Sequence, residues 1–261
     1  MTLAPSVPPT APPAEPTGDP SSASWSFFSW NILADLHIRT DWYPGVPDDL
    51  LRGPARQARV LAQLAALDVD LIALQEVEPA VLPRLRALFP DHGLCSAPHG
   101  GEGLALLVRG ARPWPQVLPL PGGRKVALLV AVPGGPRVAV VHTSYSGPPG
   151  VPGTPIERRG LAQLEAVIAH RPDVLMGDLN AAPGWPERLA LAAAGYVDHS
   201  PPGPTCNTLA RAETLDAVFC GPGWTAAAAP LAPLTPAWRL PDERNPSDHL
   251  PMRGVVRRSP A

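Results

Sequence analysis

Polar side chains follow four short apolar segments of this chain, each at the point where a strand is expected to end. The segments SFFSW, LIALQ, RVAVV and VLMG are followed by Asn31, by Glu76, by His142, and by Asp178 and Asn180. Ligands of open α/β sheets collect beyond the carboxyl ends of strands, so we expect these side chains to meet at one site. One Asp or Asn after a strand is more often a cap or a turn former, but five in succession favour a common site.

Two of these positions have structural alternatives. In an extended chain, side chains at i and i+2 point the same way, so Asp178 and Asn180 of GDLN would enter one site while Leu179 packs inside. The alternative for GDLN is an Asx-turn at the strand end. Glu76 could instead be an acidic residue at the start of a following helix, interacting with the helix dipole.

Near the end of the chain, RNPSDHLPM places Asp248 and His249 side by side between two prolines. A surface turn is one interpretation, because Asn, Pro, Ser and Asp all favour turns. In a regular strand the two side chains would point to opposite faces, so a shared site requires a bent backbone. Pro246 and Pro251 restrict the backbone in a way that is consistent with such a bend.

The chemistry follows from the donor types of the candidate set, which are mostly hard oxygen ligands with two imidazoles. The set comprises Asn31, Glu76, His142, Asp178, Asn180, Asp216, Asp248 and His249. Carboxylate and amide oxygens favour Mg²⁺ or Mn²⁺ over zinc. A hard divalent ion with carboxylates and histidines is suited to hydrolysis of a phosphate ester.

From Trp25 onward, short apolar strands alternate with amphipathic helices. Strands are predicted at WSFFSW, VDLIALQ, LALLVR, KVALLVAV, RVAVVH, DVLMG, TLDAVF and MRGVV, and helices over residues 54–68, about 79–89, 156–170 and 186–195. Strands joined only by Pro and Gly imply antiparallel hairpins beside the crossovers. The predicted fold class is therefore α/β with layered, mixed sheets.

Composition limits the organisation of the chain and its partners. Of the 261 residues, 1–24 are rich in Pro, Ser and Ala and predict a disordered leader, and 25–261 suit one catalytic domain. A net charge of −2 argues against a protein that grips long duplex DNA. The three cysteines suggest buried thiols, and neither a secretory signal nor a membrane span is evident, so we expect a cytoplasmic protein. No protein partner is indicated.

The ordered motifs resemble those of the endonuclease/exonuclease/phosphatase superfamily, the DNase I-like fold. The resemblance runs from Trp25 to the C-terminus through Asn31, LQEVE at 74–78, His142, GDLN at 177–180, TLDAVF at 214–219 and SDHLP at 247–251. It implies a four-layer α/β/β/α sandwich, two mixed β-sheets flanked by helices, with the active site at their common edge.

Within this superfamily, SWNILADL, TLDAVF and LPDERNPSDHLP are similar to the branch of nocturnin, the angel proteins, the 2′-phosphodiesterase and the carbon-catabolite-repression deadenylases. That branch acts on poly(A), 2′,5′-oligoadenylates or the 2′-phosphate of NADP(H). Thr143 stands where the branch usually has leucine, and Ala217 stands where the branch usually has tyrosine.

The resemblance implies a role for each motif residue. Glu76 is the principal Mg²⁺ ligand, with Mn²⁺ as an alternative ion, supported by Asn31 and Asp248. Asp178 orients or deprotonates the attacking water, or protonates the leaving group. Asn180 and His142 would contact phosphoryl oxygens. Asp216 would accept a hydrogen bond from His249 and so hold the imidazole in its charged form.

Substrate contacts are also predicted at Arg56, Trp42, Tyr145 and Trp185. A hydrophobic rim explains the two tryptophans equally well, capping or packing explains Tyr145 equally well, and a solvent-exposed helix face is the default for Arg56. Trp42, Tyr43 and Trp185 could stack on a base. Five histidines lack a motif partner and are expected at the surface or at helix ends: His37, His92, His99, His170 and His199.

The predicted function is a metal-dependent phosphoesterase acting on single-stranded RNA or an adenylate-containing nucleotide. The alternatives are hydrolysis of a small or lipid phosphate such as NADP(H), inositol phosphate or sphingomyelin, DNA endonuclease activity, and a catalytically dead binding module. The dead module requires loss of the metal acid or of the Asp–His pair, and both are present in the sequence.

Overall fold

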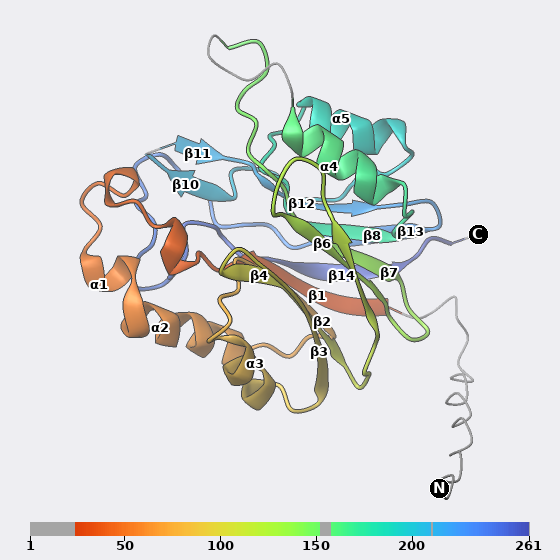
Figure 1. Cartoon of the computed structure of the whole chain (residues 1–261), viewed down its shortest axis with the longest axis horizontal. Coiled ribbons are helices and arrows are strands. Elements are labelled where there is room, and N and C mark those ends of the chain that lie inside the picture. The colour runs from red at the N-terminus through yellow and green to blue at the C-terminus, as the bar shows by residue number, and fades with distance from the viewer. Residues whose placement is uncertain (1–23, 152–157, 210, 261) are drawn as a thin grey trace, which may run out of the picture.

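The computed structural model of the chain describes residues 24–151, 158–209 and 211–260 (Figure 1). Two six-stranded mixed sheets pack face to face, with helices on both outer faces. The predicted four-layer α/β/β/α sandwich is therefore confirmed. The proline-rich leader lies outside the described residues except for Ser24, which begins the first strand.

The first sheet has the strand order β13-β14-β1-β2-β4-β3. β1 and β2 run parallel, and every other neighbouring pair in this sheet is antiparallel. The bounds of its strands are β1 Ser24–Asn31, β2 Leu71–Gln75, β3 His92–His99, β4 Glu102–Arg109, β13 Trp224–Ala228 and β14 Met252–Arg258.

The second sheet has the order β5-β6-β7-β8-β12-β9, and its one parallel pair is β7 with β8. Its strands are β5 Pro115–Pro119, β6 Val126–Ala131, β7 Arg137–His142, β8 Val174–Asp178, β9 Val197–Asp198 and β12 Asp216–Cys220. A separate hairpin pairs β10 Cys206–Thr208 with β11 Arg211–Glu213. The predicted hairpin between KVALLVAV and RVAVVH is the β6–β7 pair.

The helices divide between the two outer faces (Figure 1). Apolar side chains of α2 and α3 pack on the outer face of the first sheet, and those of α4 and α5 pack on the second. Their bounds are α1 Asp48–Leu51, α2 Gly53–Ala65, α3 Leu82–Leu88, α4 Arg159–Ile168 and α5 Pro186–Ala193. The predicted helices are present but shorter, and residues 156–157 of the third one lie outside the described part of the chain.

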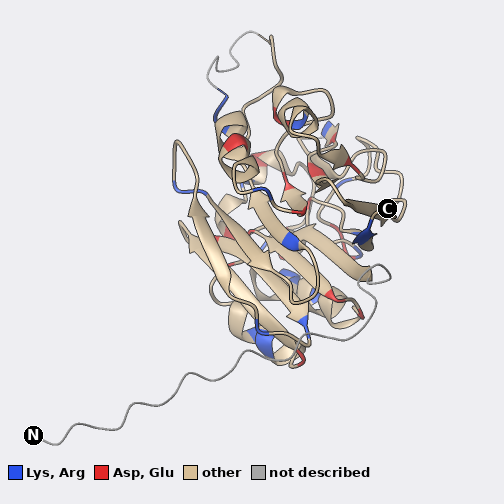
Figure 2. Cartoon of the chain, turned by 90° about the vertical axis from the view of Figure 1, so that its right-hand side faces the viewer, with Lys and Arg blue, Asp and Glu red and all other residues tan. Residues whose placement is uncertain are grey.

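Apolar side chains from both sheets fill the space between them. Phe27 and Leu71 of the first sheet and Leu128, Val140 and Met176 of the second all belong to this central core. Figure 2 shows the strands drawn mostly tan, with many of the charged residues on helices and loops. Burial on both faces of parallel strands explains their almost continuous apolar sequences. None of the helices in the described ranges is long and apolar enough to cross a membrane.

Several strands escape sequence-based prediction because they lie at sheet edges. β3 contains Gly93 and Pro98, and β5 begins and ends with proline. Both are terminal strands of their sheets. Proline lacks an amide hydrogen, and only an edge strand tolerates that loss on its open side. The residues that look like loop in the sequence are therefore edge strands.

Candidate functional site

The site lies where the carboxyl ends of the two parallel strand pairs meet. Asn31 pairs with Gln75 at the end of β1 and β2, and His142 pairs with Asp178 at the end of β7 and β8. The amide nitrogen of Asn31 donates to Glu76 Oε1 at 2.8 Å and to Asp178 Oδ2 at 3.1 Å. One side chain thus joins the ends of both sheets, so the residues predicted after successive strands do come together.

Glu76 is not the first acid of a helix, because α3 begins only at Leu82. Its backbone has a φ of 58°, a left-handed conformation that is costly for a residue with a side chain. Its carboxylate accepts hydrogen bonds from Asn31 and from the amide of Ala34 at 2.8 Å. Burial raises the pKa of Glu76 to about 7. A strained, buried carboxylate is expected at a functional position.

The GDLN segment forms the Asx-turn, and the Asp178 and Asn180 side chains still lie close together. Asn180 has a φ of 48°, so the chain is not extended there, and its amide donates to Asp178 Oδ1 at 2.8 Å in an Asx-turn. The extended geometry predicted for this segment is therefore wrong. The Asn180 side chain nevertheless reaches Thr143 O at 2.9 Å and lies 3.4 Å from Asp178 Oδ2, and Leu179 is buried as predicted.

Gly177 is required by the close approach of β7 and β8. A Cβ at this position would lie 2.1 Å from Val141 O, and the φ of 136° also disfavours other residues. Ala217 stands where the branch usually has tyrosine. It is buried and pairs with Gly177 across the ladder between β12 and β8. Thr143 is also buried, and its hydroxyl donates to Leu179 O. Both departures from the family pattern are thus packing positions in this chain.

His249 stands between two buried acids. Its Nδ1 lies 2.8 Å from Asp216 Oδ2, and its Nε2 lies 3.7 Å from Asp178 Oδ2. Burial by itself lowers the pKa of His249, but the charges of Asp216 and its neighbours raise it well above its ordinary value. Burial raises the pKa of Asp178 to about 6, against the opposing charge of His249. The arrangement is a charged imidazole beside a carboxylate that can take up a proton.

The SDHLP segment is a bent loop held by hydrogen bonds from Trp30 of β1 and from two side chains of the loop region itself, Asn245 and Ser247. The indole of Trp30 donates to His249 O at 2.8 Å, and the Asn245 amide donates to the same oxygen at 2.9 Å. The Ser247 hydroxyl donates to Asn31 O at 2.7 Å. Only an isolated bridge between His249 and Cys206 resembles strand pairing. The bend allows adjacent residues to serve one site, as Pro246 and Pro251 suggest.

Asp248 faces a different set of partners from its neighbour. Its Oδ2 accepts hydrogen bonds from the hydroxyls of Tyr43 at 2.9 Å and Thr208 at 3.0 Å. Its Oδ1 is buried and has no hydrogen-bond partner among the residues described. Tyr43 is 4 % exposed, so it positions Asp248 and does not offer a stacking surface to a base. A free, buried carboxylate oxygen fits a divalent cation.

If Asp248 holds a divalent cation, replacing Tyr43 by phenylalanine is expected to weaken binding of that cation about tenfold, because partners that orient a metal ligand typically contribute a factor of this size. The phenol donates to Asp248 Oδ2, and burial with the nearby Asp248 charge raises its pKa, so it stays a neutral donor. Titration of Mg²⁺ against activity and thermal stability measures the effect. The matched control is Tyr196→Phe, whose hydroxyl donates to Pro172 O; equal changes in both variants would contradict the role of Tyr43.

His142 is held in one tautomer. The Lys125 ammonium lies 2.9 Å from His142 Nδ1, and an ammonium can only donate, so Nδ1 accepts and the ring proton is on Nε2. Burial first, and then the Lys125 charge, hold the pKa of His142 well below its usual range. Nε2 lies 3.6 Å from Asp178 Oδ2 and 3.7 Å from Glu76 Oε1. His142 therefore presents an N–H donor between the two acids.

A second acidic centre adjoins Glu76 and was not found from the sequence. Glu102, the first residue of β4, is 3 % exposed and is surrounded by His37, His99, Lys125 and His142 within 3.9 Å of its Oε1. These contacts hold the pKa of Glu102 well below its usual range despite its burial. The Glu102 carboxylate in turn raises the pKa of His37.

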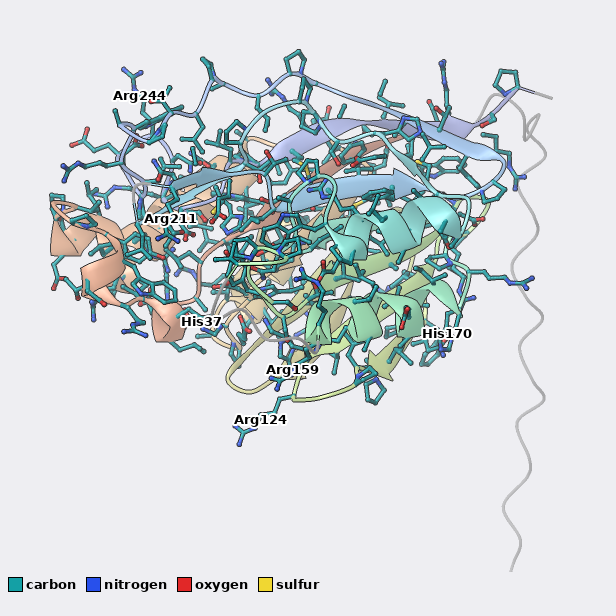
Figure 3. The ribbon with its side chains drawn as sticks, turned by 90° about the horizontal axis from the view of Figure 1, so that it is seen from above. His37, Arg124, Arg159, His170, Arg211 and Arg244 are labelled. Carbon is teal, nitrogen blue, oxygen red and sulfur yellow. The ribbon has the colours of Figure 1, made fainter. Side chains whose placement is uncertain are left out.

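Two of the five histidines expected at the surface belong to this centre. His37, labelled in Figure 3, lies on the short helix η1, Asp35–His37, and the His99 side chain is only 7 % exposed. The available signal was HGGE at 99–102, where Gly100 and Gly101 both have positive φ in a two-residue hairpin that pairs His99 with Glu102.

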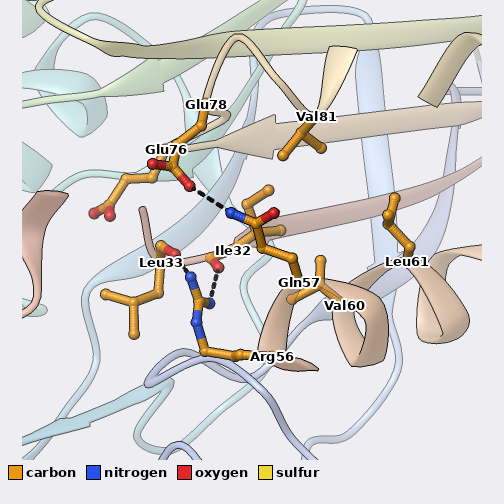
Figure 4. A pocket seen from close by; sticks show the side chains of 9 residues that line it. All are labelled: Ile32, Leu33, Arg56, Gln57, Val60, Leu61, Glu76, Glu78 and Val81. Atoms are coloured by element: carbon orange, nitrogen blue, oxygen red, sulfur yellow. Dashed lines mark hydrogen bonds between the residues drawn. The ribbon is translucent and has the colours of Figure 1, made fainter. Parts of the chain in front are cut away.

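Arg56 is a structural residue, and its prediction as a substrate contact is wrong. It is 1 % exposed and donates to the carbonyls of Ile32, Leu33 and Pro246 and to Asp35. Figure 4 shows two of these bonds beside a cavity of about 10 Å³, which has room for about one water molecule. Arg56 thus ties α2 to the loop after β1 and to the SDHLP loop.

Replacing Arg56 by methionine is expected to lower the free energy of unfolding by about 3 kcal/mol, because buried carbonyls then lose their donor. Urea unfolding followed by circular dichroism measures this. Arg59→Met on the same helix is the control, since the Arg59 side chain is one-third exposed. A loss of substrate binding at unchanged stability would instead restore Arg56 as a substrate contact.

The three aromatic candidates lie on two separate surfaces. Trp42, on the short helix η2, Thr40–Trp42, lines a cavity of about 200 Å³ together with Tyr43, Val46, Asn207, Arg239 and Leu240. Tyr145 is 47 % exposed and packs against Trp185 with ring centroids 6.0 Å apart. The Arg158 guanidinium lies 5.4 Å from the centroid of Trp185. The structure thus leaves all three available to a substrate.

Comparisons with known proteins find one matching family. The model of the endonuclease/exonuclease/phosphatase family matches residues 28–249. A search of curated proteins finds no match.

Solved structures share the fold at low sequence identity. ANGEL2, described as a 2′,3′-cyclic phosphatase in complex with adenosine-2′,3′-vanadate, is 19 % identical to this chain with a TM-score of 0.70. The match covers 90 % of this chain and 96 % of the ANGEL2 chain. The human Nocturnin catalytic domain with bound sulfate is 20 % identical, TM-score 0.66, covering 90 % and 94 %. D. rerio TDP2 with a single-strand DNA product is 16 % identical, TM-score 0.58, covering 90 % and 99 %.

Proposed function

Because the chain belongs to the endonuclease/exonuclease/phosphatase family, we propose that it is a metal-dependent phosphodiesterase that hydrolyses its substrate by in-line attack of water. The observation that carries this proposal is the bridge made by Asn31 between Glu76 and Asp178. It draws a metal-binding acid and a proton-accepting acid together at the junction of the sheets. Membership of the family and the resemblance of the sequence motifs both indicate a phosphoesterase. The divalent cation and the substrate class are the further parts of the proposal.

The residues present fit a hard divalent cation. Glu76 and Asp248 would hold Mg²⁺ or Mn²⁺, since both are buried and one oxygen of Asp248 has no partner in the described structure. When bound, the cation neutralises charge on the phosphoryl oxygens and on the departing oxygen. Asn31, the predicted supporting ligand, accepts from Leu33 N through Oδ1, which keeps a second lone pair for the cation, and its amide nitrogen donates to both acids.

The remaining residues supply proton transfer and positioning. Asp178 accepts the proton of the attacking water, because a carboxylate with a pKa of about 6 is ionised at neutral pH and still basic. His142 Nε2–H donates to a phosphoryl oxygen, and the charged His249 binds a second one, with Asp216 fixing its orientation. Asn180 keeps the Asp178 carboxylate in place through its backbone amide.

We propose an adenylate-containing nucleotide or single-stranded RNA as the substrate. The fold likeness to ANGEL2 in complex with adenosine-2′,3′-vanadate supports this class, as does a net charge of −2, which disfavours long duplex DNA. Trp42 beside its cavity, or the Tyr145–Trp185 pair, provides an aromatic surface for a base. A smaller phosphate ester is the second candidate, because the same cavity, of about 200 Å³, has room for one base or a group of similar size, as in one end of NADP(H).

A substrate panel tests the proposal. The purified chain is incubated with oligo(A), 2′,3′-cyclic AMP, NADPH, plasmid DNA and bis-p-nitrophenyl phosphate, each with Mg²⁺, with Mn²⁺ and with EDTA. We expect cleavage of an adenylate substrate with metal and none with EDTA. Preferential cleavage of plasmid DNA would contradict the proposed substrate class, and no cleavage of any substrate would favour a binding module.

A further inference from the structure

Buried polar atoms without hydrogen bonds gather around Glu102. Within the described residues, Glu102 Oε2 and both ring nitrogens of His99 have no hydrogen-bond partner. His37 Nε2 lies 3.0 Å from Glu102 Oε1 but lacks the geometry of a hydrogen bond. Each such group costs free energy in a fold where nearly all buried polar atoms are paired. Several together at one place indicate that something else satisfies them.

The geometry of this group suits a cation. One ligand atom each from His37, Glu76 and Glu102 all lie within 4.8 Å of one another. An ion bonded at about 2.1–2.3 Å bridges ligand atoms up to about 4.5 Å apart, so small side-chain shifts close the shell. His99 Nε2, 3.4 Å from Glu102 Oε1, is a fourth donor within reach. An imidazole with two carboxylates favours Mn²⁺, Fe²⁺ or Zn²⁺ over Mg²⁺.

The charges of the site leave room for more than one divalent ion. Five carboxylates are buried along this edge: Glu76, Glu102, Asp178, Asp216 and Asp248. The permanently charged basic side chains near them are Lys125, beside Glu102, and the buried Arg188, which donates to Asp216 O. Lys125 lies 3.5 Å from Oε1 of Glu102, and Oε2 of that residue remains free. The five carboxylates outnumber these two basic side chains, and the substrate phosphate adds further negative charge.

We infer that His37, Glu76 and Glu102 form a second divalent-cation site, selective for a transition metal such as Mn²⁺, with His99 as an additional ligand. This inference rests on the proposed function only in sharing Glu76 with the first cation. Two ions that share a carboxylate lie about 3.5–4 Å apart, the spacing of two-metal phosphoesterase sites.

Binding of Mn²⁺ alone, without substrate, tests the inference on the full chain. Metal-free protein is dialysed to equilibrium against Mn²⁺, and bound metal and the electron paramagnetic resonance spectrum are measured. We expect two Mn²⁺ per chain with a spin-coupled spectrum for the unmodified protein. His37→Gln and Glu102→Gln should each bind one, uncoupled Mn²⁺, with the affinity for the second lowered at least about tenfold.

The control is His170→Gln, which changes a histidine well separated from His37 in Figure 3 and should retain two ions. The His37 side chain is 40 % exposed, so His37→Gln is expected to fold even where Glu102→Gln does not. One Mn²⁺ in the unmodified protein, or two in both variants, overturns the second site and leaves the proposed function intact. Binding of no ion contradicts both.

Discussion

Replacing Asp178 by asparagine is expected to lower kcat about a thousandfold, a loss typical of removing a general base. Asparagine keeps the size of the side chain and can still accept the Asn180 amide bond, but it cannot take up the proton of the attacking water. The substitution also removes the charge that faces His249 Nε2 at 3.7 Å. KM should change much less than kcat, because Asp178 acts on the reacting water and not on ground-state binding.

The matched control is Asp91→Asn, at an exposed aspartate remote from the strand ends that form the site, which should retain full activity. Steady-state kinetics with bis-p-nitrophenyl phosphate at saturating Mg²⁺ give both constants. A higher KM with an unchanged kcat would contradict proton transfer by Asp178.

Replacing Glu76 by glutamine is expected to raise the Kd for the first cation by more than about a hundredfold, since even residues that only orient a ligand contribute ten- to a hundredfold. The single amide oxygen of glutamine can accept from only one of the two donors, Asn31 and the Ala34 amide, but the substitution also removes a buried charge, so the fold should persist. The lost charge is the one that burial already makes costly, as its pKa of about 7 indicates. Isothermal titration with Mg²⁺ measures the Kd.

Glu78→Gln is the control, because Glu78 lies two residues away and its carboxylate accepts a hydrogen bond only from Gln57 among the described side chains. The metal-free melting temperature of Glu76→Gln should be little changed. Wild-type Mg²⁺ affinity in Glu76→Gln would mean that another residue is the principal ligand.

The strand-end residues were predictable because two local rules applied to them. Parallel strands end at one edge of a sheet, so Asn31, His142 and Asp178 had to converge once their strands were recognised. Their strands are mostly buried on both faces and are largely apolar, although β1 contains serines. The four-layer fold and the family motifs followed from the same regularities.

The Glu102 centre and the role of Arg56 were not predictable, because both depend on contacts between distant segments. Glu102 meets His37 and Lys125 only after β4, η1 and the turn before β6 have packed together. Arg56 reaches Pro246, 190 positions away, and no local pattern marks an arginine as buried. Left-handed turns at Glu76 and Asn180 escaped prediction for a similar reason, since tertiary contacts impose them.

The most direct measurement is the rate of phosphodiester hydrolysis by the unmodified chain and by Asp178→Asn, each in Mg²⁺ and in EDTA. If this edge of the sheets is the catalytic centre, only the unmodified chain in Mg²⁺ shows substantial turnover, and EDTA or Asp178→Asn each abolishes nearly all of it. Hydrolysis that persists in EDTA, or in Asp178→Asn at the unmodified rate, would contradict a metal-dependent reaction at this site.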